Sequence, residues 1–150
     1  MPASPPTAPC ACGRLRRAAR ALTQLYDDEM APSGLRLTQF SLLRTVARKS
    51  STRITELAAA QLLDRTALSR NLDPLVERGL ISIAPGRDAR TRVVAITAKG
   101  RAALRTAEPR WGKAQAKVAK QIGVQRLRAL IELLGELEAL HPAPDARRLL

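Results

Sequence analysis

The sequence predicts a mainly α-helical protein with one small β-hairpin, and three observations lead to this expectation. Apolar residues make up 45% of the 150 residues, enough to form a core, yet only one Phe, one Tyr and one Trp are present. Alanine and leucine dominate instead, and they favour helices packed on helices over a sheet sandwich. Two short runs rich in β-branched residues follow each other after residue 79 and indicate two paired strands.

The N-terminal part is predicted to be a tail followed by one helix. Four prolines stand within the first nine residues, so residues 1–12 are expected to be disordered. A helix is expected from about Gly13 to Met30, because its apolar residues recur at helical spacing. Pro32 and Gly34 then end this helix.

Three further helices are expected before the strands. The first has Thr38 as its N-cap. A short helix then spans Ile54–Ala60. The third spans Arg65–Arg78, with Asp64 as its N-cap and Gly79 after its last turn. Two short helices in quick succession are typical of a helix-turn-helix.

The predicted hairpin follows directly, and helices complete the chain. Leu80–Ala84 and Arg92–Thr97 have the pattern of strands, and the polar segment 85–91 between them is long enough to project as a loop. A long helix is then expected to run to about Ile122, with Pro109 producing a kink or marking a shift in its start. The sequence thus predicts a helix-turn-helix with a hairpin wing, enclosed by further helices.

The charge of the chain indicates a polyanionic partner. Twenty-six Lys and Arg residues against 13 Asp and Glu residues give a formal net charge of +13. Such a balance points to nucleic acid or an anionic surface. No stretch approaches the roughly 18 apolar residues of a membrane span, and the N-terminus lacks the features of a secretion signal. A cytoplasmic protein that binds nucleic acid without membrane contact is therefore expected.

The helix predicted over residues 65–78 has one apolar face and one face suited to reading DNA. Its expected buried stripe is Leu68, Leu72, Leu75 and Val76. The opposite face carries guanidinium and hydroxyl groups, which bind guanine edges, other base edges and phosphates. They lie in the first two turns, the part of a recognition helix that meets the bases. These candidate DNA contacts are Arg65, Thr66, Ser69 and Arg70.

The loop between the strands adds a second candidate contact. Arg87 and Arg90 are expected near the tip of the hairpin, with Asp88 placed to pair with one of them. An arginine on a thin projection suits a narrow minor groove, whose negative potential attracts a guanidinium. Recognition helix and wing together predict binding to double-stranded DNA.

The segments 64–81, 88–90 and 93–100 resemble the multiple antibiotic resistance regulator (MarR) family in order and spacing. The resemblance extends over about residues 13–140. It implies a homodimeric transcriptional regulator with a winged helix-turn-helix in each subunit, dimerised by its first and last two helices. It also implies major-groove contacts by the recognition-helix residues named above, a wing contact by Arg90, and release of DNA by a small ligand or an oxidant.

Two positions depart from the usual pattern of such a motif. Many members of the family have Gly in the turn before the recognition helix, where this chain has Leu62. Pro74 falls inside the predicted recognition helix and is expected to bend it or to remove one backbone hydrogen bond.

A leucine stripe near the C-terminus is the best candidate for the dimer interface. Apolar residues recur at spacings of three and four between Leu127 and Leu140, and Pro142 is expected to end this last helix. In such a dimer the two recognition helices lie about one DNA turn apart, and each binds one half-site of a pseudo-palindromic operator. The interface residues predicted are Leu15, Leu22, Leu127, Leu130, Leu134 and Leu137.

A small aromatic or phenolic acid is the effector that we favour on the sequence alone. Arginines that grip a carboxylate and aromatic side chains that line a pocket are the groups that such a ligand needs. The candidates are Arg17, Arg20, Tyr26, Phe40 and Trp111. The ligand is expected to release a repressor from its operator.

Cys10 and Cys12 are a possible redox pair, and they leave a thiol-based switch open as an alternative. They precede a predicted helix start beside several arginines, an environment that favours the reactive thiolate. Their expected position in the tail argues against them, because a disulfide there has little rigid structure to act on. His141 is the only histidine, so no metal site is expected.

Enzymes and nonspecific DNA binders are the competing classes. The chain contains no phosphate-binding loop, nucleophile elbow, zinc-protease helix or dinucleotide fingerprint, so neither an enzyme nor a cofactor is expected. A nonspecific basic protein explains the charge but not the group of reading side chains at one helix start. The predicted organisation is a tail (1–12), a first dimerisation helix (13–34), a winged helix-turn-helix lobe (35–100), dimerisation helices (101–141) and a C-terminal tail (142–150).

Overall fold

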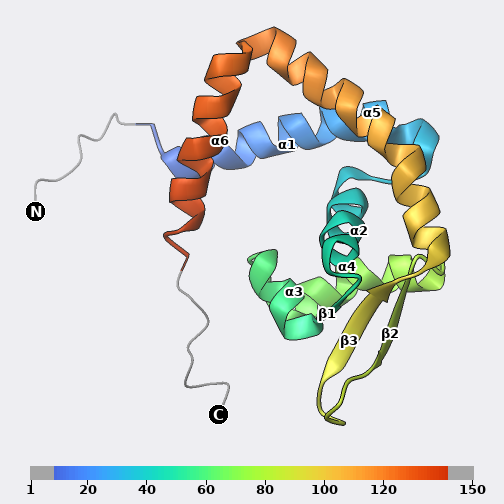
Figure 1. Cartoon of the computed structure of the whole chain (residues 1–150). Coiled ribbons are helices and arrows are strands. Elements are labelled where there is room, and N and C mark those ends of the chain that lie inside the picture. The colour runs from blue at the N-terminus through green and yellow to red at the C-terminus, as the bar shows by residue number, and fades with distance from the viewer. Residues whose placement is uncertain (1–8, 142–150) are drawn as a thin grey trace, which may run out of the picture.

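The structure, a computed structural model, describes residues 9–141 as α-helices and one small sheet (Figure 1). The tails predicted before residue 9 and after residue 141, including the role of Pro142, lie outside the described residues. In chain order the elements are α1 (Ala11–Met30), the 3-10 turn η1 (Ala31–Ser33), α2 (Leu37–Lys49), β1 (Ser51–Arg53), α3 (Ile54–Ala60), α4 (Arg65–Glu77), β2 (Ile81–Pro85), β3 (Arg92–Ile96), α5 (Ala98–Ile122) and α6 (Val124–Glu138).

These elements form two parts. Helices α2, α3 and α4 and the sheet form one part, here called the lobe, from which the β2–β3 hairpin projects (Figure 1). Helices α1, α5 and α6 form an open frame on one side of it, here called the arm. The mainly helical fold with a hairpin wing is therefore confirmed. None of the helices in the described part is long and apolar enough to cross a membrane.

The lobe has a continuous apolar core that also includes the last residue of α1 and one residue of α5. Its fully buried side chains come from η1's flanks, α2, α3, α4, β2, β3 and α5. Burial of aliphatic side chains in one cluster is the main favourable term in folding such a domain. The largest are Met30, Leu35, Phe40, Leu43, Val46, Leu57, Leu68, Leu72, Leu75, Leu80 and Val94.

Helix α2 begins earlier than the sequence predicted, because side chains of α1 and of α2 itself accept hydrogen bonds from the N–H groups at its start. The Leu37 N–H donates to Asp27 Oδ1 of α1 at 2.7 Å. The Arg36 N–H donates to Gln39 Oε1 at 3.1 Å. Thr38 therefore lies inside the helix, and the prediction that it is the N-cap was wrong.

The sheet has the strand order β1-β3-β2, with both pairings antiparallel. The two strands of the predicted hairpin are confirmed, with boundaries shifted by one residue. Strand β1 was not predicted, since its three residues are polar and two of them are exposed. Thr52 at its centre is buried and donates from Oγ1 to Glu56 Oε2 at 3.3 Å, which accounts for a polar side chain in this position.

Several side-chain contacts join the arm to the lobe and to itself. The Tyr26 hydroxyl of α1 donates to Gln115 Oε1 of α5, and burial raises the pKa of Tyr26. Lys117 of α5 donates to Glu29, and this hydrogen bond holds the pKa of the Glu29 carboxyl below its usual range. Trp111 packs against both apolar clusters of the chain. The acidic end of α1 is thus the point where α1, α2 and α5 are tied together.

Candidate DNA interface

The recognition helix α4 is fixed at both ends by hydrogen bonds. Asp64 is its N-cap, as predicted, and its Oδ1 accepts the Ala67 N–H at 2.8 Å. At the other end, Gly79 takes the left-handed conformation (φ 69°), and Lys99 of α5 donates to the Arg78 carbonyl at 2.8 Å. The helix continues through Pro74 without interruption.

One face of α4 is buried and the other is open. Leu68, Leu72 and Leu75 are almost fully buried, as predicted. Val76, which was predicted to join them, is 39% exposed, because it lies at the edge of the stripe rather than beneath it. The side chains predicted to contact DNA, namely Arg65, Thr66, Ser69 and Arg70, are all exposed on the first two turns. The helix therefore presents donors for base edges and phosphates at its N-terminal end.

The turn between α3 and α4 keeps the geometry of a helix-turn-helix although it lacks glycine. Leu62 has φ 51°, in the left-handed region. Its N–H donates to the Ala59 carbonyl at 3.1 Å, and the Leu63 N–H donates to the Ala58 carbonyl at 3.0 Å. A leucine thus occupies a conformation that favours glycine, and the turn is held by its hydrogen bonds.

The wing loop is ordered by short-range hydrogen bonds. The Gly86 N–H donates to the Thr91 carbonyl at 2.7 Å, and the Thr91 N–H donates to the Asp88 carbonyl at 2.9 Å. Asp88 Oδ1 accepts the backbone N–H of Arg90 at 3.1 Å. The carboxylate that the sequence analysis expected to pair with a guanidinium therefore stabilises the loop backbone instead.

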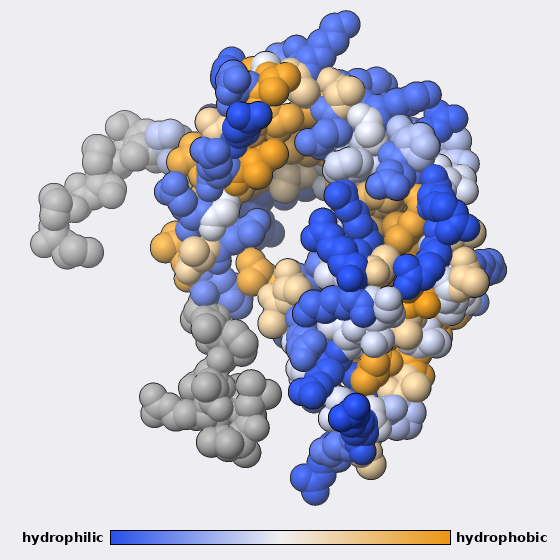
Figure 2. Space-filling view, in the orientation of Figure 1, coloured by the Kyte–Doolittle hydropathy of each residue, from blue (hydrophilic) through white to orange (hydrophobic). Residues whose placement is uncertain are grey.

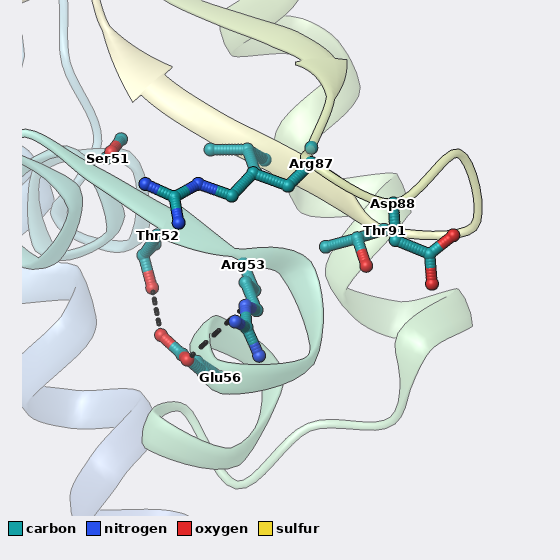
Figure 3. A pocket seen from close by; sticks show the side chains of 9 residues that line it. Ser51, Thr52, Arg53, Glu56, Arg87, Asp88 and Thr91 are labelled. Carbon is teal, nitrogen blue, oxygen red and sulfur yellow. Dashed lines mark hydrogen bonds and ion pairs between the residues drawn. The ribbon is translucent and has the colours of Figure 1, made fainter. Parts of the chain in front are cut away.

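The two wing arginines are both exposed but lie differently. The Arg87 side chain folds back from the loop across an open cleft toward Ser51 and Thr52 of β1 (Figure 3). Arg90 lies in the turn between Asp88 and Thr91. The sequence analysis had placed both near the tip of the hairpin, with Arg90 as the wing contact implied by the family resemblance.

The hairpin is held in place by the start of α5. Thr97 Oγ1 donates to the Gly79 carbonyl at 2.7 Å and accepts the Gly100 N–H at 3.0 Å. Gly100 packs so closely on β2 that a Cβ atom there would stand 2.1 Å from the Leu80 carbonyl oxygen. The wing and the recognition helix are therefore set relative to each other by backbone contact.

The residues predicted to bind an effector do not converge in one subunit. Tyr26 and Phe40 are buried in the two apolar clusters, and Phe40 stacks on the half-buried Trp111 with ring centroids 5.9 Å apart. Arg17 and Arg20 are exposed on the N-terminal half of α1. A different cation accompanies the aromatic pair: the Arg44 guanidinium lies 4.6 Å from the centre of the Trp111 ring. Arg44 could not be identified from the sequence, because only the packing of α2 on α5 brings its side chain and Trp111 together.

Cys10 and Cys12 belong to the start of α1, not to a preceding tail. Cys10 is the N-cap, and its Sγ accepts the Gly13 N–H at 3.4 Å. Cys12 lies within the first turn, and both thiols are exposed. The expected boundary between tail and helix is therefore moved to Ala11, and the thiols are part of an ordered helix terminus.

Within the arm, apolar side chains are exposed along α6 and on part of α1 (Figure 2). No residue of α6 is buried, and Ile131, Leu133 and Leu137 are more than two fifths exposed. The predicted interface residues are exposed or half-buried: Leu15, Leu22, Leu127, Leu130, Leu134 and Leu137.

Comparisons with known proteins agree with this architecture. A sequence model described as the MarR family matches residues 33–91, which run from the end of η1 through the wing loop and stop just before β3. The search of curated proteins found no match. Among solved structures, the M. tuberculosis transcriptional regulator MosR in complex with DNA is 44% identical, with a TM-score of 0.77. The match covers 86% of this chain and 96% of that one.

Two more distant structures share the fold. A mutant MarR from E. coli complexed with operator DNA is 24% identical, with a TM-score of 0.76 over 83% of this chain and 91% of that one. CouR from Rhodococcus jostii bound to p-coumaroyl-CoA is 21% identical, with a TM-score of 0.74 over 87% and 92%. The winged helix fold, the family match and the 44% identity over nearly the whole of a MosR chain together show that this chain belongs to the MarR family of DNA-binding transcriptional regulators.

Proposed function

We propose that the protein is a homodimeric, sequence-specific repressor that acts in the cytoplasm and leaves its operator in response to an effector. The observation that carries this proposal is the group of exposed donors on the first two turns of α4, next to a basic wing. The MosR and E. coli MarR neighbours were both solved with DNA, which supports the same class of partner here.

The proposed binding mode follows from what each element presents. Helix α4 enters the major groove with Arg65 and Arg70 toward guanine edges and with Thr66 and Ser69 toward bases or phosphates. Arg90 on the wing lies in the adjacent minor groove, where it responds mainly to the shape and potential of the groove.

The exposed apolar face of α6 supports a dimer. A helix of 15 residues without one buried side chain has little reason to stay folded unless another surface covers it. A second copy of the chain provides that surface and also supplies the second half-site reader. The operator is then pseudo-palindromic.

A small aromatic acid is the first candidate effector, with Trp111 and Arg44 as its receiving groups. A carboxylate on the Arg44 guanidinium and a ring against the half-buried indole would compete with the present stacking of these two side chains. Because Trp111 packs on both clusters, such a ligand would change how the arm sits on the lobe. CouR, which shares the fold, was solved with an aromatic acyl-CoA ligand.

Oxidation of the thiols is the second candidate, and the geometry of α1 supports it more directly. Cys10 is the extended N-cap of α1 and Cys12 lies in its first turn, so a disulfide between them would remove the cap that the Cys10 Sγ now provides. That turn leads into the exposed half of α1, which belongs to the proposed dimer region. Oxidation therefore has an ordered element to act on.

The test of sequence-specific binding uses Arg70→Ala, with operator fragments selected from genomic DNA by the parent protein. Loss of a bidentate contact to guanine costs about 1–3 kcal/mol and relaxes selectivity at one base position. Arg105→Ala, at an exposed site on α5, is the matched control and should bind like the parent.

The measurement is the affinity for operator in the presence of excess random DNA, together with the sedimentation mass of the parent. A parent that random DNA displaces from the operator as easily as operator DNA does is a nonspecific basic protein. A parent that sediments as a monomer is not the proposed homodimer.

A further inference from the structure

An open cleft lies between the wing loop and the segment that joins β1 to α3 (Figure 3). Its volume is about 510 Å³. One wall is formed by β1 and the start of α3, and the other by the wing loop and the edge of β3. The lining is mostly polar and charged: Ser51, Thr52, Arg53, Glu56, Gly86, Arg87, Asp88, Thr91 and Val93.

Each wall contributes one guanidinium. Arg53, at the end of β1, has a side chain that is 65% exposed, and its Nε lies 3.9 Å from Glu56 Oε1. Arg87 reaches across the cleft from the wing and makes no ion pair within the described residues. The hydroxyls of Ser51 and Thr91 stand on opposite walls beside them. Arginine and hydroxyl groups are the side chains that most often hold DNA phosphates.

The position of the cleft matches the path of a DNA strand. In a helix-turn-helix, the second helix lies in the major groove and the first helix crosses the backbone. The wing lies in the neighbouring minor groove. The strand that separates the two grooves must therefore pass between the start of α3, the first helix of the motif, and the wing loop, and this is where the cleft lies.

We propose that this cleft is a clamp for one backbone phosphate of the operator, with Arg53 and Arg87 holding the phosphate from opposite sides. The proposal rests on the proposed DNA-binding function and adds a site to it. It also gives Arg87 a role distinct from that of Arg90: Arg87 fixes the register of the strand, and Arg90 reads the minor groove.

The two carboxylates of the cleft have separate effects. Asp88 is engaged with the loop backbone through the Arg90 N–H. Glu56 accepts from Thr52 Oγ1 and attracts Arg53, so it holds Arg53 near the cleft but also competes with the phosphate for it. Glutamine at position 56 still accepts the Thr52 hydrogen bond but carries no charge, so Glu56→Gln should tighten DNA binding.

The test scans the operator with single methylphosphonate substitutions, each of which neutralises one phosphate. Parent, Arg53→Gln and Arg87→Gln are compared on every duplex. At one phosphate per half-site, the substitution should weaken the parent roughly tenfold, the loss of one charge-assisted contact. The same substitution should change the affinity of either variant much less, because the contact is already lost. Each variant should also reduce the slope of log K against log salt by about one unit, equally on operator and random DNA.

Three comparisons decide the outcome. Lys120→Gln, on the exposed end of α5 far from the wing, should respond to every methylphosphonate like the parent. Glu56→Gln should bind operator severalfold more tightly than the parent. The clamp is wrong if Arg53→Gln and Arg87→Gln respond to every methylphosphonate as strongly as the parent does. It is also wrong if the two variants lose their response at different phosphates. A failure of the underlying function is distinguishable, because the parent itself would then show no operator preference.

Discussion

At the scale of single residues, the position of the exposed polar face of α4 depends on the turn before this helix, which contains one strained residue. Leu62 stands in the left-handed region with its side chain 44% exposed. Little burial offsets the strain there, since nearly half of the side chain remains in solvent. The turn instead depends on the hydrogen bonds of the Leu62 and Leu63 N–H groups to the end of α3. Backbone geometry, and not the leucine side chain, positions the start of the recognition helix.

This arrangement predicts that Leu62→Gly is more stable than Leu62→Ala. Both variants lose the same leucine side chain, but alanine keeps the Cβ atom that makes the left-handed conformation costly. The cost is roughly 1–2 kcal/mol, and the greater freedom of glycine in the unfolded chain offsets about 0.5–1 kcal/mol of it. We expect a net difference of about 1 kcal/mol in the free energy of unfolding, measured by urea titration. Equal stabilities would mean that the turn relaxes out of the left-handed region.

The same scale shows which candidate residues can be located from the sequence. The exposure of Arg65 and Arg70 was predictable, because helical periodicity alone puts them opposite the buried leucines. Arg53 was not, because β1 is a strand only through its pairing with β3, some 40 residues further along the chain. No local pattern in three polar residues announces that pairing. The same holds for Arg44, whose partner Trp111 lies on another helix.

At the scale of elements, the wing is positioned by its contact with the first turn of α5. Gly100 is fully enclosed there, and Lys99 and Thr97 bind the carbonyls at the end of α4 and the start of β2. The start of α5 therefore contacts both the C-terminal end of α4 and the segment that leads into the wing hairpin. The sequence indicated each of the three elements, but it did not indicate that a glycine in a helix was needed to join them.

This contact predicts that Gly100→Ala destabilises the protein and weakens DNA binding together. A methyl group at this site would overlap the Leu80 carbonyl oxygen and approach Ile96 Cγ1 at 2.9 Å, so the hairpin must shift. Overpacking of this kind costs about 1–3 kcal/mol. The measurements are urea unfolding and operator affinity.

Gly112→Ala on the same helix is the matched control. No described atom outside the local helix backbone lies within 4 Å of a Cβ placed there, so the variant should gain about 0.5–1 kcal/mol from its better helix propensity. A Gly100→Ala protein as stable as the parent would show that the wing is not fixed by this contact.

At the scale of the whole molecule, the arm and the lobe have different kinds of stability. The lobe surrounds an apolar core to which Met30 at the end of α1 and Ala107 of α5 also contribute, whereas the N-terminal half of α1 and all of α6 have no buried residue. Sequence periodicity predicted the apolar stripe on α6; within the described residues, Leu127 of this stripe packs against the smaller apolar cluster, whereas Ile131 and Leu137 remain exposed. The arm is therefore the part of the molecule where an effector can shift an equilibrium at low energetic cost, provided that the effector binds the two states differently.

The last prediction separates the two candidate effectors through Cys10 and Cys12. Peroxide oxidises one thiolate to a sulfenic acid with release of hydroxide, and the second thiol then condenses with the sulfenic acid, which forms the disulfide and releases one water. Because this disulfide takes the Cys10 Sγ away from the Gly13 N–H, oxidation is expected to destabilise the turn that Cys10 now caps. We expect peroxide to weaken operator binding by the parent at least tenfold and to leave the double variant Cys10→Ser, Cys12→Ser unchanged. Both proteins should bind operator equally under reducing conditions, since serine also caps helices.

The same titrations with benzoate in place of peroxide test the aromatic-acid route. Benzoate should weaken operator binding by both proteins alike, and this effect should be lost in Arg44→Gln. Release of the parent and the double variant by peroxide to the same extent would exclude the thiols as the switch.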